Sequence, residues 1–419
     1  MRARRESDSV VITGIGLKAS VGATRESVWR GVREGRSAMR RLTHLVGIPD
    51  GMLIGAPVDV ELAAPDQLKI LAMCDQVADE ALRDAQVGPR TARPERFGCS
   101  ISAHMGDIRW SIAQLGLDHL VPQGSTPWWQ QWLPNTACAQ VANRHRLLGP
   151  RLCHSTACAS GLIEVLSAAR AIQDGQCDMA LAGSAEVINS LFAAGFHQMR
   201  VLAEHDDPQQ ACRPFDLGRQ GFVMGEGAAM FVLERLSHAQ ARGAPIYAEI
   251  AGGCLLATAH HVTGLDLESD ALAHLISEVM RTAKVSPADI GYINAHGTGT
   301  QQNDIAETRA IRRAMGLAAQ QLCVSATKSI LGHLINAAGS VELAITALAM
   351  RDGFVPPTLN LTRPDPECDL DCIPLVGRKS SFSCALKLSV AFGGALAGVV
   401  LKRHEHAASR AADPLLRAA

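Results

Sequence analysis

The chain has 419 residues, of which 47% are apolar, 19% are charged and 4% are aromatic, and its formal net charge is −1. This length and composition predict a globular protein of one large or two medium domains and exclude a disordered chain. The near-neutral charge argues against a nucleic-acid partner and against binding to an anionic membrane surface.

The N-terminal residues are basic but contain no apolar stretch before the polar segment 6–9, so no secretory signal is expected. No window of the sequence approaches the roughly 18 apolar residues of a membrane-spanning helix. We therefore expect a cytoplasmic protein in which the twelve cysteines stay reduced. No two cysteines have CxxC spacing, and the pair Cys368 and Cys372 has no later partner pair, so no metal site is predicted.

The first predicted strand is Val10–Ile15, an apolar run that Gly14 and Gly16 are expected to end as a turn. The segment GIGLKASVG, residues 14–22, weakly resembles a dinucleotide-binding loop. Ala19 stands where a third glycine would be needed, and no acidic residue follows a second strand. A turn after the strand is therefore the preferred interpretation.

Further strands and helices follow in chain order. Apolar runs predict strands at 96–102, 149–155, 179–183, 225–234, 247–251, 290–294 and 322–325, and a hairpin pair at 387–392 and 396–402. Helical periodicity predicts helices at 162–172 and 335–350. This alternation of strands and helices occurs twice, which indicates an α/β fold with two halves, residues 1–250 and 251–403. The Ala- and Arg-rich residues 404–419 are expected to form a flexible tail.

The segment CHSTACASGLIEV, residues 153–165, contains two cysteines, of which Cys158 lies where a strand ends and a helix begins. Free backbone N–H groups and the positive end of the helix dipole face such a position, and both favour a thiolate over a thiol. Small residues on both sides leave room for a substrate. Cys158 is therefore a candidate nucleophile, whereas Cys153, on the strand, is expected to be structural.

Two glycine-containing segments supply polar partners for a reactive thiol. In AHGTGT, residues 295–300, His296 follows a predicted strand, and in TKSILGH, residues 327–333, Lys328 and His333 follow another. Most of the fifteen histidines are expected to be structural, but a polar ring at a strand exit beside glycine is typical of a functional loop. His296, His333 and Lys328 are therefore the candidate catalytic partners of Cys158.

Four blocks of the sequence together resemble the β-ketoacyl–acyl-carrier-protein synthases of the thiolase-like superfamily, in their elongating branch. The blocks are STACASG at 155–161, CRPFDLGRQGFVMGEGA at 212–228, AHGTGT with QQND and a glutamate at 295–307, and TKSILGH followed by NAAGSVE at 327–342. They agree with the family in order and spacing, and the resemblance extends from Val10 to about Arg403. It implies a thiolase-like fold, in which two pseudo-repeated halves pack as α-β-α-β-α layers.

The resemblance also implies a reaction, the decarboxylative Claisen condensation of fatty-acid-like or polyketide-like biosynthesis. An acyl chain passes from a carrier phosphopantetheine to Cys158. His296 and His333 then help a malonyl-carrier to lose carbon dioxide and stabilise the enolate, which attacks the thioester to give a 3-oxoacyl-carrier. No permanently bound cofactor is implied. The implied partners are an acyl carrier protein and a second subunit, in a homodimer or in a heterodimer with a related chain.

The resemblance assigns further roles around the nucleophile. The backbone N–H groups of Cys158 and Phe392 are the implied oxyanion donors, and Phe392 and Gly393 belong to a gate. Lys328 is expected to pair with Glu307 and to tune the site electrostatically rather than to act as a nucleophile.

Five other residues match positions that support the site or bind the substrate arm. Glu342 and Asp304 are expected to support the catalytic residues from behind. Thr298 and Thr300 match the threonines that hydrogen-bond the pantetheine arm, and Phe222 matches an aromatic residue beside the malonyl pocket.

The chain departs from the family at its gate, where NSFGFGGTN is usual and residues 388–396 read LSVAFGGAL. Ala391 replaces a glycine, and Ala395 and Leu396 replace a Thr-Asn pair. Alanine has less backbone freedom than glycine, a difference in conformational free energy of about a few tenths to 1 kcal/mol. We therefore predict altered gating or acyl selectivity. The Trp-rich segment PWWQQW, residues 127–132, is expected to line the acyl pocket or to pack at an interface.

Two other functions compete with the condensing enzyme. A non-catalytic partner subunit that shapes chain length would usually lack the nucleophile, whereas Cys158 is present. An initiating synthase or a degradative thiolase would resemble a Cys-His-Asn or Cys-His-Cys set, whereas this chain has HGTGT and KSILGH. The sequence therefore favours the elongating synthase.

Overall fold

A computed structural model describes residues 9–63, 67–88, 90–105 and 133–404 of the chain. In these residues ten strands form one mixed sheet, and two smaller sheets lie beside it. The Trp-rich segment 127–132 and residues 405–419 of the expected tail lie outside the described residues.

The large sheet consists of two halves of five strands each. In spatial order the first half is β1 (Val10–Ala19), β8 (Gly227–Arg235), β6 (Met179–Glu186), β4 (Phe97–Ala103) and β5 (Arg151–Leu152), and the second is β9 (Ala248–Ala257), β15 (Ala395–Lys402), β14 (Cys384–Val390), β10 (Ile290–Asn294) and β11 (Cys323–Ser325). In each half the first three strands are antiparallel neighbours and the last three are parallel neighbours. The two halves therefore repeat one topology. They join where β1 pairs briefly with β9.

The smaller sheets and the helices complete the fold. One small sheet contains β2 (Arg40–Arg41), β3 (Ile54–Ala56) and β7 (Met224–Gly225), and the other contains β12 (Phe354–Val355) and β13 (Arg378–Lys379). The described helices are α1 (Arg25–Arg33), α2 (Lys69–Asp84), α5 (Thr136–Arg144), α6 (Ser160–Gln173), α7 (Ser190–Gln198), α8 (Leu236–Ala241), α9 (Asp270–Ala283), α10 (Gln301–Met315), α11 (Lys328–Leu331) and α12 (Ala338–Asp352). Short 3-10 turns are η2 (Pro94–Arg96), η4 (Ala157–Ala159), η5 (Pro208–Gln210), η6 (Pro287–Asp289), η7 (Gly316–Gln320) and η8 (Ile335–Ala337).

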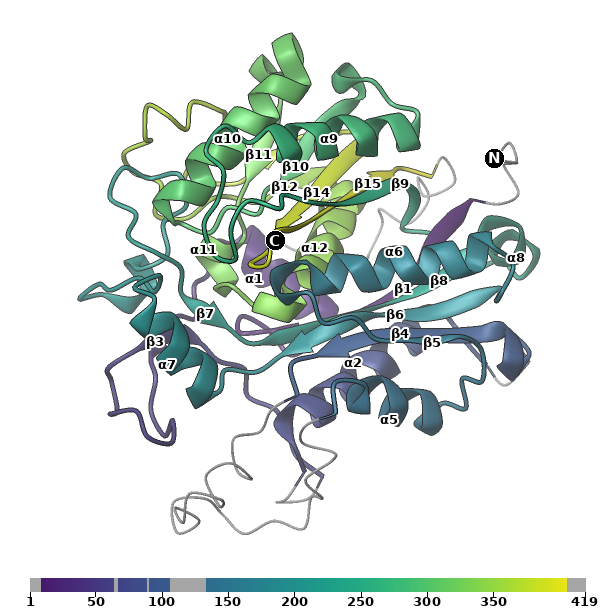
Figure 1. Cartoon of the computed structure of the whole chain (residues 1–419). Coiled ribbons are helices and arrows are strands. Elements are labelled where there is room, and N and C mark those ends of the chain that lie inside the picture. Colours follow the sequence, from purple (N-terminus) through teal and green to yellow (C-terminus); the bar gives the residue numbers. More distant parts are fainter. Residues whose placement is uncertain (1–8, 64–66, 89, 106–132, 405–419) are drawn as a thin grey trace, which may run out of the picture.

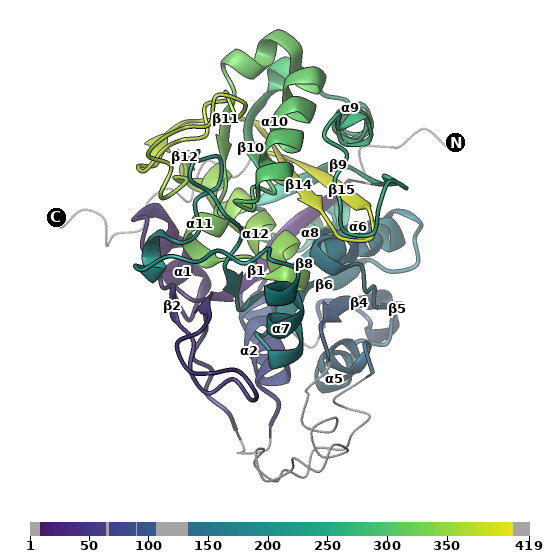
Figure 2. The same cartoon turned by 60° about the vertical axis from the view of Figure 1, so that its left-hand side comes forward.

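The elements stack in five layers (Figure 1). Helices α6 and α12 lie between the two half-sheets, α2 and α5 cover the outer face of the first half-sheet, and α9 and α10 cover that of the second. Figure 2 shows the same order from another side. Because protein covers α12 all round, every residue from Ala338 to Met350 is buried. The predicted thiolase-like fold of two pseudo-repeated halves is confirmed.

The expected turn at Gly14 and Gly16 is wrong, because β1 continues through both glycines to Ala19. Helix α2 crosses the strand so closely that a Cβ on Gly14 would lie 2.3 Å from the Ala81 carbonyl oxygen. A Cβ on Gly16 would lie 1.9 Å from the carbonyl oxygen of Val77. These glycines therefore permit close packing of a helix on a strand.

Most of the other predicted elements are found, with longer strands than the apolar runs suggested. Strand β10 covers the predicted residues, the hairpin of β14 and β15 forms, and β6 and β9 extend to Glu186 and Ala257. The predicted strand around Cys153 is limited to two residues, so Cys153 lies one position beyond β5. Its thiol donates to the carbonyl of Pro134 at 3.1 Å, a structural contact.

Candidate active site

Four segments of the chain converge on one site beside the central helix layer. Cys158 follows β5, His296 follows β10, Lys328 and His333 follow β11, and Phe392 follows β14. Because β10, β11 and β14 are parallel neighbours, the loops that leave them emerge at the same edge of the sheet. The topology thus brings together residues that lie more than a hundred positions apart in sequence.

Cys158 lies in η4, immediately before α6, and only 6% of its surface is exposed. The preceding residue, Ala157, has a φ of 47°, which turns the chain sharply into the helix. The backbone N–H groups of Cys158 and Phe392 both act on the thiol to lower its pKa, and these are the two predicted oxyanion donors.

The predicted effect of the helix end on Cys158 is opposed by burial. Burial raises the pKa of Cys158 to about 12, because desolvation outweighs the favourable effects of Lys328 and the two N–H groups. The carboxylate of Glu186 raises the pKa further. The N–H groups at the helix end lower the pKa of Cys158, as predicted, but burial raises it by more.

His333 is the immediate side-chain neighbour of Cys158. Its Nε2 lies 3.1 Å from the Cys158 sulfur. Its Nδ1 accepts the backbone N–H of Ile335 at 3.2 Å. A neutral imidazole carries one proton, so acceptance at Nδ1 places that proton on Nε2. His333 therefore presents an N–H donor to the space beside the sulfur.

His296 lies against His333 with its ring nearly perpendicular, at 84° and a centroid separation of 5.3 Å. Burial holds the pKa of both rings well below the ordinary histidine value, and Lys328 and Lys387 lower it further. Both imidazoles are therefore neutral at physiological pH. The backbone N–H groups of His296 and Gly297 donate to Glu307 at 2.6 and 2.8 Å, which fixes the loop.

The predicted pairing of Lys328 with Glu307 is wrong. Lys328 donates to both carboxylate oxygens of Glu342, at 2.7 and 2.9 Å, and to the carbonyl of His296 at 2.5 Å. Glu307 is occupied by backbone N–H groups of the loop instead. A further lysine, Lys387, reaches Glu342 at 2.6 Å. The sequence interpretation missed Lys387, although a lysine inside an apolar strand was the available signal.

The threonine loop is organised by Asp304 on α10. Its carboxylate accepts the backbone N–H groups of Thr298, Gly299 and Phe215 at 3.1, 3.2 and 2.8 Å. The hydroxyls of Thr298 and Thr300 lie 2.9 Å apart. This arrangement places two neighbouring hydroxyls beside His296, where they can bind a polar substrate arm.

A row of aromatic rings leads away from the histidines. Phe222 contacts His333 at a centroid distance of 5.1 Å, and Phe196 contacts Phe222 at 5.3 Å and Phe392 at 6.4 Å. The row continues through Phe192 to His104 at 6.2 and 4.9 Å. His104 lines a cavity of about 500 Å³.

The segment predicted to be the gate forms the tight turn between β14 and β15. The Ala391 N–H donates to the Ala395 carbonyl at 2.9 Å, while Gly393 and Gly394 have φ values of 84° and 81°. The Gly393 N–H donates to the Val262 carbonyl at 2.7 Å, which ties the turn to the loop before α9. Ala391 does not have a positive φ, so its methyl group is accommodated.

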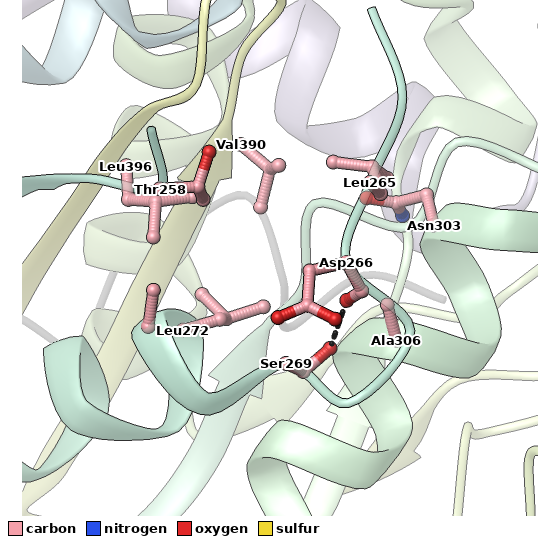
Figure 3. A pocket seen from close by; sticks show the side chains of 10 residues that line it. Thr258, Leu265, Asp266, Ser269, Leu272, Asn303, Ala306, Val390 and Leu396 are labelled. Carbon is pink, nitrogen blue, oxygen red and sulfur yellow. Dashed lines mark hydrogen bonds between the residues drawn. The ribbon is translucent and has the colours of Figure 1, made fainter. Parts of the chain in front are cut away.

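A small cavity of about 20 Å³ lies behind this turn (Figure 3). Leu396, Val390 and Thr258 lie across it from Asp266. The Asp266 carboxylate accepts the Glu268 N–H at 3.0 Å, and Leu396 offers it no donor. The Thr258 N–H donates to the Gly394 carbonyl at 2.9 Å, so a second backbone bond holds the loop to the turn beside the apolar contacts of the cavity.

The described residues contain no cluster of three or more His, Cys, Asp or Glu side chains placed to hold a metal ion. In the same part of the chain, no helix is long and apolar enough to cross a membrane.

The sequence matches two family descriptions. Residues 61–239 match "Beta-ketoacyl synthase, N-terminal domain", and residues 247–362 match "Beta-ketoacyl synthase, C-terminal domain".

Similar curated proteins span nearly the whole chain. The tetracenomycin polyketide synthase ketoacyl synthase alpha subunit of Streptomyces glaucescens is 37% identical, over 96% of this chain and 98% of that protein. The 3-oxoacyl-(acyl-carrier-protein) synthase 2 of Staphylococcus aureus is 36% identical, over 96% of this chain and 99% of that protein.

Solved structures agree with these matches. A type II polyketide ketosynthase, solved with its acyl-carrier protein and bound to a hexaketide, superposes with a TM-score of 0.88 at 31% identity, covering 95% of this chain and 99% of that one. A beta-ketoacyl synthase from Burkholderia phymatum has a TM-score of 0.84 at 29% identity, covering 95% of this chain and all of that one.

Proposed function

The chain belongs to the β-ketoacyl synthase family, and on this premise we propose that Cys158, His296 and His333 perform its condensation. It is an acyltransferase that joins an acyl thioester to a malonyl-carrier. The observation that carries the assignment of residues is the 3.1 Å contact between His333 Nε2 and the Cys158 sulfur, with the ring of His296 beside it.

The acyl-transfer step uses Cys158 as the nucleophile. Its sulfur attacks the carrier thioester, the new carbon–sulfur bond forms as the old one breaks, and the thiol proton ends on the departing pantetheine sulfur. The N–H groups of Cys158 and Phe392 face the same point and can hold the oxygen that becomes negative during the transfer. This use of the N–H groups explains why a nucleophile with a high resting pKa lies at a helix end.

The decarboxylation step uses the two neutral imidazoles. When the malonyl group loses carbon dioxide, its electron pair forms an enolate, and N–H donors from His296 and His333 can hold the enolate oxygen in a dry site. The enolate carbon then attacks the thioester on Cys158, and the cysteine sulfur leaves as a thiolate, which takes up one proton from solvent. Thr298 and Thr300 would hold the pantetheine arm during both steps, and Phe222 would flank the malonyl group.

The surrounding charges keep these groups in place. Glu342 holds Lys328, which fixes the His296 carbonyl, while Glu307 and Asp304 fix the N–H groups of the same loop. We assign Phe392 and Gly393 to the gate. Residues 1–250 would then carry the nucleophile, and residues 251–403 the histidines and lysines.

We infer a polyketide-type acyl chain rather than a saturated one. The 500 Å³ cavity at the end of the aromatic row is lined in part by charged side chains, which suit an oxygenated chain better than an alkyl chain. Glu186 pairs with His104 at 2.8 Å and, against the effect of burial, raises the pKa of that ring. Lys69 similarly pairs with Glu226 at 2.5 Å.

The working complex follows from the same premise. We infer that the enzyme receives its substrates from an acyl carrier protein, as the type II ketosynthase above was solved with its own carrier, and that it needs no permanently bound cofactor. We propose a homodimer, with a heterodimer with a related subunit as the alternative. A cytoplasmic location is consistent with the twelve cysteines, all of which are free.

The experiment is intact-mass analysis after incubation with a panel of acyl-carriers that differ in length and in the number of keto groups. Wild type and a Cys153→Ala control should gain the acyl mass, whereas Cys158→Ala should not. Cys158→Gln should still release carbon dioxide from a malonyl-carrier. No acyl gain with any carrier would contradict the assignment of the nucleophile, and equal or better loading by saturated chains would contradict the polyketide preference.

A further inference from the structure

Lys387 on β14 is fully buried and has no part in the reaction as described so far. Its Nζ lies 2.6 Å from Glu342 Oε2 and donates to the Ala295 carbonyl at 3.1 Å. Glu342 also binds Lys328 at 2.7 Å. One carboxylate in the central helix layer therefore carries two ammonium groups. Burying a second ammonium costs free energy, so its presence calls for an explanation beyond packing.

The two lysines hold adjacent peptide groups of the loop that carries His296. Lys387 binds the carbonyl of Ala295, and Lys328 binds the carbonyl of His296 itself. Glu307 accepts the His296 N–H from the opposite side. The backbone at His296 is thus fixed by charged side chains from three different elements, β14, α11 and α10.

The charge of Lys387 also acts on both rings. The titratable groups packed around the imidazoles are Cys158 on η4, Glu186 on β6, Asp304 and Glu307 on α10, Lys328 on α11, Glu342 on α12 and Lys387 on β14. After burial, Lys328 and Lys387 lower the pKa of His333, and the same two lysines with His333 lower that of His296. Lys387 remains largely charged at neutral pH, since burial lowers its pKa to about 8.

We propose that Lys387 is a positioning residue of the condensing site, which fixes the His296 loop and adds a second positive charge beside the two imidazoles. The inference rests on the proposed roles of His296 and His333. A neutral imidazole donates a hydrogen bond to the enolate, whereas an imidazolium is acidic enough to protonate it. Protonation would release an acetyl-carrier in place of the 3-oxoacyl product. Lys387 therefore protects the enolate until it attacks the thioester.

The test compares Lys387→Met, Lys387→Arg and the exposed-lysine control Lys402→Met. Condensation rate and the ratio of acetyl-carrier to 3-oxoacyl-carrier are measured from about pH 4.5 to about pH 8.5, a range that extends below the ordinary histidine pKa and reaches the pH at which the wild-type rings should begin to charge. In the pH–rate profile of Lys387→Met, the fall in condensation rate at acid pH should move to higher pH by on the order of one unit. The same variant should release more acetyl-carrier at low pH. Lys387→Arg and Lys402→Met should keep the wild-type limb.

An unchanged acid limb and product ratio in folded Lys387→Met would overturn the proposal, even if the rate fell, because a purely structural role would lower the rate alone. If that variant does not fold, ¹³C-histidine NMR of the wild type gives the answer. His296 and His333, identified with His→Gln variants, should stay uncharged down to about pH 5. A charged ring at neutral pH overturns the proposal. Failure of the proposed function is a separate result, namely a wild type that makes no 3-oxoacyl product.

Discussion

Replacing Lys387 by methionine should change how stability depends on pH. Burial lowers the pKa of this lysine to about 8, from 10.5 for an unperturbed side chain. Between these two values the unfolded chain binds more protons than the folded one, so stability rises with pH in that interval. The penalty for burying the charge is therefore fully present below about pH 8 and is relieved as the pH approaches 10.5.

The magnitude follows from the two pKa values. A difference of about 2.5 units corresponds to about 3 kcal/mol at neutral pH, and the same linkage leaves about 1 kcal/mol at about pH 9.5. The uncharged methionine has no charge to bury, so the variant is free of this penalty. The stability of Lys387→Met relative to the wild type should therefore fall by about 2 kcal/mol between pH 7 and about pH 9.5. Loss of the donor to the Ala295 carbonyl costs about 1–3 kcal/mol, but it offsets the advantage equally at each pH.

The assay is urea unfolding of wild type, Lys387→Met and Lys402→Met at both pH values, with the free energy of unfolding taken from each midpoint and slope. Lys402 is exposed at the end of β15, so its variant should track the wild type. A difference between Lys387→Met and wild type that stays constant within about 0.5 kcal/mol would refute the reasoning, because it would mean that Lys387 has the same pKa in both states.

Three other predictions concern the site, the packing and the gate. His333→Ala should lower carbon dioxide release from a malonyl-carrier by about 10²–10³-fold while the acyl-enzyme still forms, and a near-normal rate would rule out an N–H donor there. Gly16→Ala should lower stability in a thermal melt by about 3 kcal/mol or more, because its Cβ would meet a backbone carbonyl of α2 at 1.9 Å. Gly195→Ala on α7, with nothing within 4 Å, should instead gain up to about 1 kcal/mol, and equal effects of the two would contradict the packing argument. Ala391→Gly should loosen the gate and broaden acyl-chain preference in competition assays, and an unchanged preference would show that Ala391 does not set it.

The sequence by itself determined the family, the α/β class and the strand exits that bear the reactive groups. Cys158, His296 and His333 could be selected as candidates because each lies in a short motif whose residues are adjacent in the chain. The duplicated strand pattern was visible for the same reason, since apolar runs and helical periodicity are local properties. The duplicated topology of the sheet bears this pattern out.

Only the tertiary structure decided which charges meet. The sequence predicted Glu307 as the partner of Lys328, whereas its contact with Glu342 depends on α12 passing between the half-sheets. The same packing brings Lys387 to that carboxylate from a strand that is distant in sequence.

Tertiary structure also set the protonation states and the use of the glycines in β1. The helix end that marks Cys158 favours a thiolate, but desolvation reverses the result. The glycines that look like a turn are needed for the approach of α2. Desolvation and close packing depend on neighbours from the whole chain. Motifs and periodicity record only neighbours in sequence, so they could not reveal either effect.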